Sequence, residues 1–281
     1  MRDRSKGMRS LVIMLPVGLI LLGLFWGLVN VVVGSFMSND VPSLTLYADF
    51  FSRASSLETL WRTIWMALLT AGICAIIAYP VAYFIARHAK RRDLWVFFII
   101  LPWLVSLVVR TFGWIVLLGN SGIVNGMLRS SGLIDAPLPL MFNMGGVITG
   151  LVHVLCPFML LSILSVFFHL DKSLEEASMS LRAGPLLTFW KVTLPLTMPG
   201  VMSGFIIVYL VATGAIVTPL MLGGIRDAVL GTRIYHEVTN MFNFPAASSM
   251  AVILSLVAFA VVLPLQWIER YISRNIHKIE T

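Results

Sequence analysis

The chain has 281 residues, of which 58% are hydrophobic and 12% are charged, and its mean hydropathy is +0.92. A soluble domain carries about a quarter charged residues. The composition therefore excludes an ordinary soluble domain and predicts a protein dissolved largely in lipid. The formal net charge of +7 would also fit a nucleic-acid-binding protein. The positions of the basic residues, given below, exclude nucleic-acid binding.

Six long apolar runs follow one another along the chain, and each is long enough to cross a bilayer. A spanning helix needs about 20 apolar residues. Spanning strands are shorter and alternate in polarity, so long unbroken runs favour helices. We therefore predict an all-α membrane protein with six transmembrane helices in a single domain, residues 1–281. The predicted spans are Leu11–Phe36, Leu60–Ala86, Leu94–Leu118, Met144–Phe168, Val201–Leu222 and Ala246–Ile268.

The first run admits two interpretations, because four basic residues precede it. A cleaved signal peptide would have a shorter apolar core and a small-residue cleavage site after it. The run Leu11–Phe36 is longer than that and no such site follows. An uncleaved membrane anchor is the favoured interpretation.

The basic residues indicate the orientation of the spans, because cytoplasmic segments retain positive charge. Four Lys or Arg residues precede the first span, four lie between the second and third, three between the fourth and fifth, and three follow the sixth. The opposite side has five, and Arg110 falls within a span. We therefore predict a multi-pass protein of the bacterial inner membrane with both termini in the cytoplasm.

The cytoplasmic segment 169–200 predicts two short helices outside the bilayer. Ser173 and Glu176 form a capping-box pattern. In this pattern the serine side chain accepts from the backbone N–H of the third helical residue, and the glutamate side chain accepts from the backbone N–H of the serine. The helix that follows has apolar residues at helical spacing on one face. These residues are Leu174, Ala177 and Leu181.

Three proline-containing pairs divide the rest of this segment. Gly184-Pro185 would break the first helix, and a second short helix would run through Trp190 and Val192. We expect Leu194-Pro195 and Pro199-Gly200 to end the second helix and redirect the chain into the fifth span. The apolar stripe of this element could rest on lipid headgroups or dock into a groove on a cytoplasmic partner.

The same segment resembles the EAA loop of binding-protein-dependent ABC importer permeases, in which Glu-Ala-Ala is followed by a glycine and a distal Leu-Pro. Glu176-Ala177, Phe189-Trp190 and Leu194-Pro195 are in register with that pattern. Ser178 replaces the second alanine, and Arg182 replaces the glycine, with a glycine following at Gly184, so that the turn would be shifted or differently shaped.

The resemblance implies a type I ABC importer permease with cytoplasmic coupling helices. It also implies partners: a second permease subunit, a dimer of cytoplasmic ATPase subunits, and a periplasmic or lipid-anchored binding protein, all around a membrane-embedded chain. The residues expected to couple the chain to the ATPase are Ser173, Leu174, Glu175, Glu176, Ala177, Leu181, Gly184, Phe189, Leu194 and Pro195.

Further motifs are similar to spermidine/putrescine-type permeases and favour a polyamine as the solute. They are Leu101-Pro102-Trp103, the segments 109–114 and 122–125, and the run 214–224. The polyamine permeases tend to have an acidic residue where this chain has Ala215, and the predicted spans contain no Asp or Glu. An opine, an amino-acid derivative or an organophosphonate therefore stays open as the solute.

Several residues within or near the spans are candidates for a substrate path. An ionisable group in a membrane span is costly and suggests function. Arg110 could meet a solute, pair with a carbonyl or a partner carboxylate, or extend to the interface. Trp103, Trp114, Tyr209 and Tyr235 could cage an ammonium group or belong to interfacial belts. Thr213 and Thr218 offer hydroxyls to a path or bond back to their own helix.

Rival classes are disfavoured by what the sequence contains. A phosphate-binding loop of the Gly-x-x-x-x-Gly-Lys-Ser/Thr type does not occur, so ATP hydrolysis would come from another chain. A secondary transporter or channel would bury acids at mid-membrane. An embedded enzyme would need a His, Asp or Glu cluster. His153 could be a proton relay or a ligand, but a hydrogen-bonded packing role is favoured, and Cys74 and Cys156 are expected to serve packing. We expect no catalytic residue, metal or cofactor.

Overall fold

The computed structural model describes residues 2–38 and 41–277, with side chains described for residues 15–37 and 41–271. Within these residues, six helices are long and apolar enough to cross a membrane. This confirms the predicted all-α class and the number of spans. The chain divides into two compact units, which are described separately.

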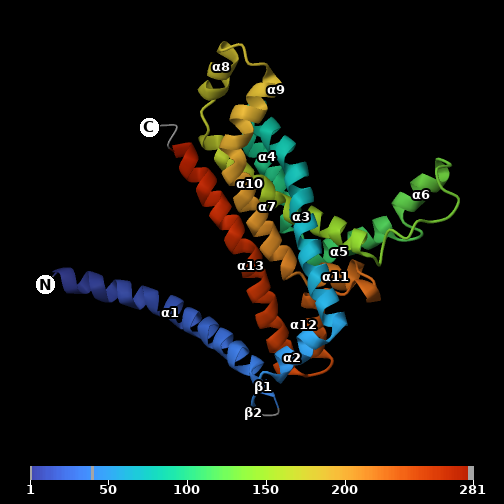
Figure 1. The fold of residues 1–281 in the computed structure, drawn as a ribbon. Helices are drawn as coiled ribbons and strands as arrows, with labels where there is room; N and C mark the ends of the chain where they lie inside the picture. Colours follow the sequence, from blue (N-terminus) through green and yellow to red (C-terminus); the bar gives the residue numbers. More distant parts are fainter. Residues whose placement is uncertain (1, 39–40, 278–281) are drawn as a thin grey trace. The chain divides into compact units, whose positions relative to one another are not determined.

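The helices and strands follow one another in the order shown in Figure 1. The elements of the first half are α1 (Arg2–Ser35), β1 (Met37–Ser38), β2 (Val41–Pro42), α2 (Thr45–Ser52), α3 (Ala54–Arg87), α4 (Arg92–Ile100), the 3-10 turn η1 (Leu101–Leu104), α5 (Leu107–Leu118) and α6 (Ile123–Ser130). Those of the second half are α7 (Met144–His169), α8 (Ser173–Ser180), α9 (Pro185–Thr188), the π-helical turn η2 (Phe189–Thr193), α10 (Leu194–Thr213), α11 (Val217–Leu222), η3 (Ile225–Asp227), α12 (Leu230–Thr239) and α13 (Phe244–His277).

The first unit comprises residues 1–57 and 233–255. Its two short strands pair antiparallel, with Met37 opposite Pro42. The turn after α1 is held to α2 by Tyr47, whose hydroxyl donates to Ser35 Oγ at 2.7 Å and whose ring lies 5.3 Å from that of Phe36. Arg233 donates to the carbonyl oxygen of Ser55 at 3.2 Å and so joins α12 to the start of α3.

The second unit comprises residues 58–232 and 256–281, and its core lies between α3, α7 and α10. Helix α3 presents small side chains at helical spacing to this core, and these side chains are fully buried. They are Ala67, Ala71, Cys74, Ala78 and Ala82. Because helices in lipid gain little from hydrophobic burial against one another, close van der Waals packing through small residues has to hold them together.

Helices α7 and α10 pack closely along most of their length, and two glycines of α10 allow this approach. A Cβ atom at Gly200 would lie 2.9 Å from the carbonyl oxygen of Ser162, and one at Gly204 would lie 2.7 Å from the sulfur of Met159. These glycines are four residues apart and therefore share a face of the helix. They form the small-residue contact typical of packed membrane helices.

The third predicted span, Leu94–Leu118, is wrong as a single helix. The chain forms α4, then the 3-10 turn η1, and resumes as α5 at Leu107. The break contains Pro102, which has no N–H for the helical ladder, and continues through extended residues Val105 and Ser106. The candidate membrane span in this region runs over Leu107–Ser130 and comprises α5 and α6.

The fifth predicted span, Val201–Leu222, begins earlier than expected and ends earlier as well. Helical structure extends over Pro185–Thr213, so that α9, η2 and α10 form one rod. The helix stops at Thr213, and α11 begins after an interruption at residues 214–216. The other four spans lie within α1, α3, α7 and α13, with boundaries shifted by a few residues.

Candidate coupling surface and transport path

The segment 171–193 forms a bent projection of two short helices, which we call the elbow. It consists of α8, a turn, α9 and η2, and α8 and α9 extend beyond one end of α7 and α10 in the second unit (Figure 1). This confirms the two helices predicted there. Helix α8 is an eight-residue element, and a helix that short is marginal alone, so its anchoring contacts decide its orientation.

The start of α8 is capped differently from the prediction. No hydrogen bond between Ser173 and Glu176 is found in the described part of the chain, so the capping box is wrong. Instead the backbone N–H of Ser173 donates to Asp171 Oδ1 at 2.9 Å. This hydrogen bond lowers the pKa of Asp171 below its usual value, because it stabilises the charged carboxylate. A short acidic side chain just before a helix is also a favoured capping residue.

The end of α8 forms a Schellman motif, and Arg182 occupies its left-handed position. Arg182 has φ +62°, its N–H donates to the carbonyl of Met179 at 3.0 Å, and the N–H of Ala183 donates to that of Ser178 at 3.3 Å. Of the two expected alternatives, a shift of the turn to Gly184 does not occur, since Gly184 has φ −67°. Arginine thus adopts the conformation that glycine takes most easily.

The second elbow helix does not end at Leu194-Pro195, contrary to the prediction. Helix α9 passes through the π turn η2 directly into α10, and Pro199 lies inside that helix. Pro195 cannot donate to the carbonyl four residues earlier, and its ring would clash with it in an α-helix. A π turn directly before Pro195 accommodates this, with the N–H of Leu194 donating to the carbonyl of Phe189.

The outer surface of the elbow is apolar and exposed. Leu181 is 84% exposed, Leu186 73% and Leu174 39%, and Ala177 and Glu176 are exposed as well. The predicted apolar face therefore exists and is uncovered in this chain. Phe189 differs, because its ring packs against Tyr79 and Tyr83 of α3 at 5.7 and 6.1 Å. It serves to seat the elbow on α3.

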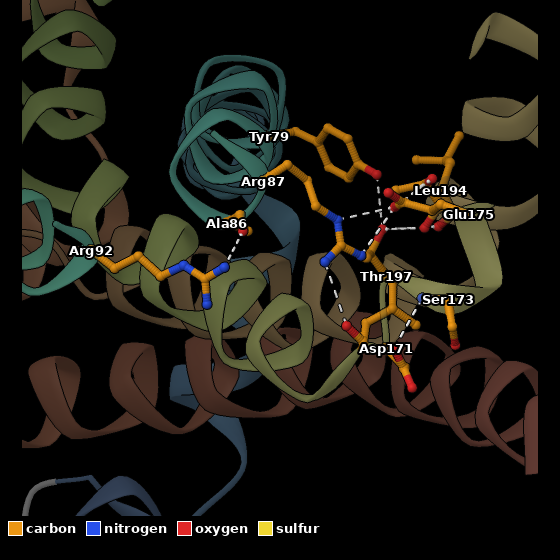
Figure 2. Close-up of polar contacts among 11 residues, drawn as sticks. Tyr79, Ala86, Arg87, Arg92, Asp171, Ser173, Glu175, Leu194 and Thr197 are labelled. Carbon is orange, nitrogen blue, oxygen red and sulfur yellow. Dashed lines mark hydrogen bonds and ion pairs between the residues drawn. The ribbon is translucent and has the colours of Figure 1, made fainter. Parts of the chain in front are cut away.

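Glu175 is buried and forms an ion pair that the sequence analysis did not predict. Its Oε1 accepts hydrogen bonds from Arg87 Nη2 at 3.0 Å and Nε at 3.2 Å, and from Thr193 Oγ1 at 2.9 Å. Figure 2 shows Arg87 reaching from α3 to the first turn of α8. A basic residue at the end of a span had been interpreted only as an orientation signal, which is why this pairing was missed.

Three of the six predicted path residues cluster between α5 and the preceding 3-10 turn. Arg110 donates to the carbonyl oxygen of Trp103 at 3.5 Å, and its Nε is buried without a hydrogen-bond partner among the described residues. Trp114 donates through Nε1 to His153 Nδ1 on α7 at 3.2 Å. His153 therefore carries its proton on Nε2 in the neutral form, so this side chain and Arg110 both offer donors.

The other three predicted path residues lie inside the helix packing. Tyr209 is 0% exposed, and Thr213 and Thr218 are buried too. Thr213 donates back to the carbonyl of Tyr209 at 2.8 Å, which matches the alternative of a hydroxyl bonded to its own helix. The structure thus does not bring the six residues onto one surface, and Tyr209 is not open to an aromatic cage.

Comparison with known sequences settles the family. Residues 78–278 match the family described as "Binding-protein-dependent transport system inner membrane component". The chain belongs to this family. It is 30% identical to the spermidine/putrescine transport system permease protein PotB of Salmonella typhimurium, over 99% of both chains, and 35% identical to PotB of Haemophilus influenzae, over 69% of this chain and 68% of that one.

Comparison with solved structures agrees on the fold. A bacterial ABC transporter involved in the import of the acidic polysaccharide alginate superimposes with a TM-score of 0.80 at 16% identity, covering 96% of this chain and 98% of that chain. The predicted type I importer permease fold is confirmed, as is a multi-pass chain of the inner membrane. This protein is a permease subunit of an ABC importer, and its relatives are transport permeases.

Proposed function

We propose that this permease forms half of the translocation path for a polyamine of the spermidine/putrescine class and is driven through its elbow by a separate ATPase. The observation that carries the polyamine is the 30% identity to a spermidine/putrescine permease along 99% of both chains. The exposed apolar surface of α8 and α9 supports docking, since a cytoplasmic subunit would cover it.

The proposed assembly contains a second permease subunit, two ATPase subunits and a periplasmic or lipid-anchored binding protein. Both termini and the elbow lie on the cytoplasmic side in this proposal, because the basic residues concentrate in the segments that would face the cytoplasm. Closure of the ATPase dimer would push the elbow, and the helices attached to it would switch the path from outward to inward opening.

Two variants test the coupling role of the elbow. Glu176→Lys reverses an exposed charge on α8, and deletion of residues 174–184 removes most of that helix. In proteoliposomes containing the assembled importer, both should abolish uptake of radiolabelled spermidine although the chain still inserts. Asp135→Lys reverses an exposed charge outside the elbow and should leave uptake intact. Normal uptake by the deletion variant would refute the coupling role.

An anionic or zwitterionic solute is the second candidate, and Arg110 is the observation that favours it. This guanidinium lies in an apolar helix, and segments 60–86, 107–130, 144–169 and 185–213 contain no Asp or Glu to balance a polycation. Burying uncompensated charge is costly. An opine, an amino-acid derivative or an organophosphonate would supply an acceptor for Arg110.

Neutralising Arg110 distinguishes the two solutes. If the path carries a polycation, Arg110→Gln should preserve or increase spermidine uptake, because it removes a like charge. If the path carries an anion, Arg110→Gln should abolish uptake and Arg110→Lys should restore part of it. The affinity of the cognate binding protein for spermidine, measured by calorimetry, provides the independent check, and absence of binding would remove the polyamine proposal.

A further inference from the structure

Three side chains join helix α8 to α3 and to η2, and we call them the clasp: Arg87 of α3, Glu175 of α8 and Thr193 of η2. One carboxylate oxygen, Glu175 Oε1, accepts all three of their hydrogen bonds, at 2.9 to 3.2 Å. The side chains of Arg87 and Glu175 are only 7% and 12% exposed. The clasp therefore joins three separate elements at one largely buried carboxylate.

Arg87 extends the same connection to α7. Its Nη1 donates to the carbonyl oxygen of Leu170, the residue that follows α7, at 3.4 Å. Its guanidinium also lies over the ring of Phe167 at 5.6 Å from the centroid, within the range of cation–π attraction. The end of α7, the end of α3 and the first turn of α8 are thus fixed relative to one another by one side chain.

A second path of hydrogen bonds returns from the clasp to α3. Thr197 donates to the carbonyl of Thr193 at 2.8 Å, and its hydroxyl also bonds the Tyr79 hydroxyl at 2.8 Å. Tyr79 lies on α3 two turns before Arg87. Figure 2 shows the resulting ring of contacts, which leaves α3 at Arg87 and returns to it at Tyr79.

We propose that the clasp is a positioning device, which makes α8 move as one body with α3 and the rod formed by α9, η2 and α10, so that force received by the elbow reaches the spans. This inference rests on the proposed coupling function. A buried ion pair adds little net stability compared with apolar residues of the same shape, but it tolerates few geometries. Helix α8 has eight residues, and without the clasp it would turn relative to α3 when pushed and would not pass the force on.

The test uses the complete importer reconstituted with its ATPase subunits, second permease and binding protein in nanodiscs and proteoliposomes. Glu175→Gln keeps the shape of the side chain but removes the charge, and Thr193→Val removes one donor at nearly constant volume. Glu58→Gln is the matched control, because Glu58 forms an exposed ion pair with Arg62 at 2.6 Å, away from the elbow.

Three quantities are measured for each variant: spermidine uptake per ATP hydrolysed, the unfolding temperature, and the distance distribution between spin labels on Ser180 of α8 and Ile77 of α3. For Glu175→Gln we expect uptake per ATP to fall about ten-fold or more, because a hydrogen bond to a charged group shifts an equilibrium by at least that factor. The distance distribution should broaden, and Thr193→Val should show a smaller change in both. Glu58→Gln should match the wild type.

The outcomes separate this inference from the proposed function. If uptake per ATP and the label distances of Glu175→Gln match those of the control, the positioning role is overturned. It is also overturned if uptake falls only in proportion to the amount of folded protein, since that is a loss of stability alone. If deletion of residues 174–184 leaves uptake normal, the coupling function itself fails, whatever the clasp variants show.

Discussion

Replacing Arg182 by glycine should stabilise the turn between the two elbow helices. A residue with a Cβ atom pays about 1–2 kcal/mol for the left-handed conformation, and Arg182 has φ +62°. Glycine removes that cost but gives the unfolded chain more freedom, which offsets about 0.4–1 kcal/mol. In the described part of the chain, the Arg182 side chain makes no hydrogen bond or ion pair, so little else is lost. The expected net gain is about 0.5–1 kcal/mol.

Hydrogen exchange measures this gain directly. The amides of Arg182 and Ala183 donate the two hydrogen bonds of the Schellman motif, and both should exchange about two- to five-fold more slowly if opening of the turn costs that much more. In the Arg182→Gly variant the protection is read at position 182 itself and at Ala183. Membrane-embedded amides of α10 serve as the internal reference, because the substitution does not touch them.

Two control variants separate backbone strain from charge. Arg182→Ala removes the guanidinium but keeps the Cβ atom, so it should show no slower exchange than the wild type. Gly184→Ser adds a Cβ atom where φ is −67° and nothing lies within 4 Å, so it should be tolerated, and serine is a good N-cap for α9. Equal protection in Arg182→Ala and Arg182→Gly, or a loss of protection in Gly184→Ser, would refute this reasoning.

Three further substitutions test other contacts of the elbow and its helices. Asp171→Ala should fray the first turn of α8, whereas Asp171→Asn should be tolerated. The N–H of Ser173 lowers the pKa of Asp171, so the stabilisation is present above the unfolded pKa and is lost as the pH falls through the lower folded value. Exchange of α8 amides should therefore accelerate only below about pH 4. Gly204→Leu should separate α10 from α7 and lower the unfolding temperature in detergent. Gly72 faces open space, so Gly72→Leu should leave the unfolding temperature unchanged. An equal fall in unfolding temperature for the two variants would contradict the close packing of α10 on α7. Pro195→Ala restores an N–H and should let the π turn become α-helical, which rotates the elbow by about 100° relative to α10. Uptake per ATP should then drop without loss of thermal stability. Unchanged uptake per ATP would show that the π turn does not set the orientation of the elbow.

The sequence was sufficient to predict the spans, because apolar runs of this length have few alternatives in a chain with 12% charge. It failed where the backbone departs from one helix per span. Pro102 was visible, but a proline can also sit within a helix, as Pro80 and Pro157 do. Whether a proline breaks the helix or sits within it depends on the packing of α4 and α5 against their neighbours. The pattern of apolar residues contains no information about that packing.

The elbow, too, could be predicted from the sequence only in part. The helical spacing of Leu174, Ala177 and Leu181 was enough to predict the exposed face of α8, because periodicity reports which residues share a face. It did not show that Glu175 is the buried acid and Glu176 the exposed one. That depends on Arg87, 88 residues earlier in the chain, and such a partner is known only once the fold brings the two helices together.

The uninterrupted rod from Pro185 to Thr213 has a mechanical consequence. Its 29 residues span about 43 Å at 1.5 Å per residue, and of its two contact glycines Gly200, near the middle, comes closer to the backbone of α7. The arms on either side measure about 22 and 20 Å. A rocking of about 10° around that fulcrum would therefore displace both tips by nearly the same amount, about 4 Å, in opposite directions. An inward thrust at one tip becomes an outward swing at the other with almost no loss of travel.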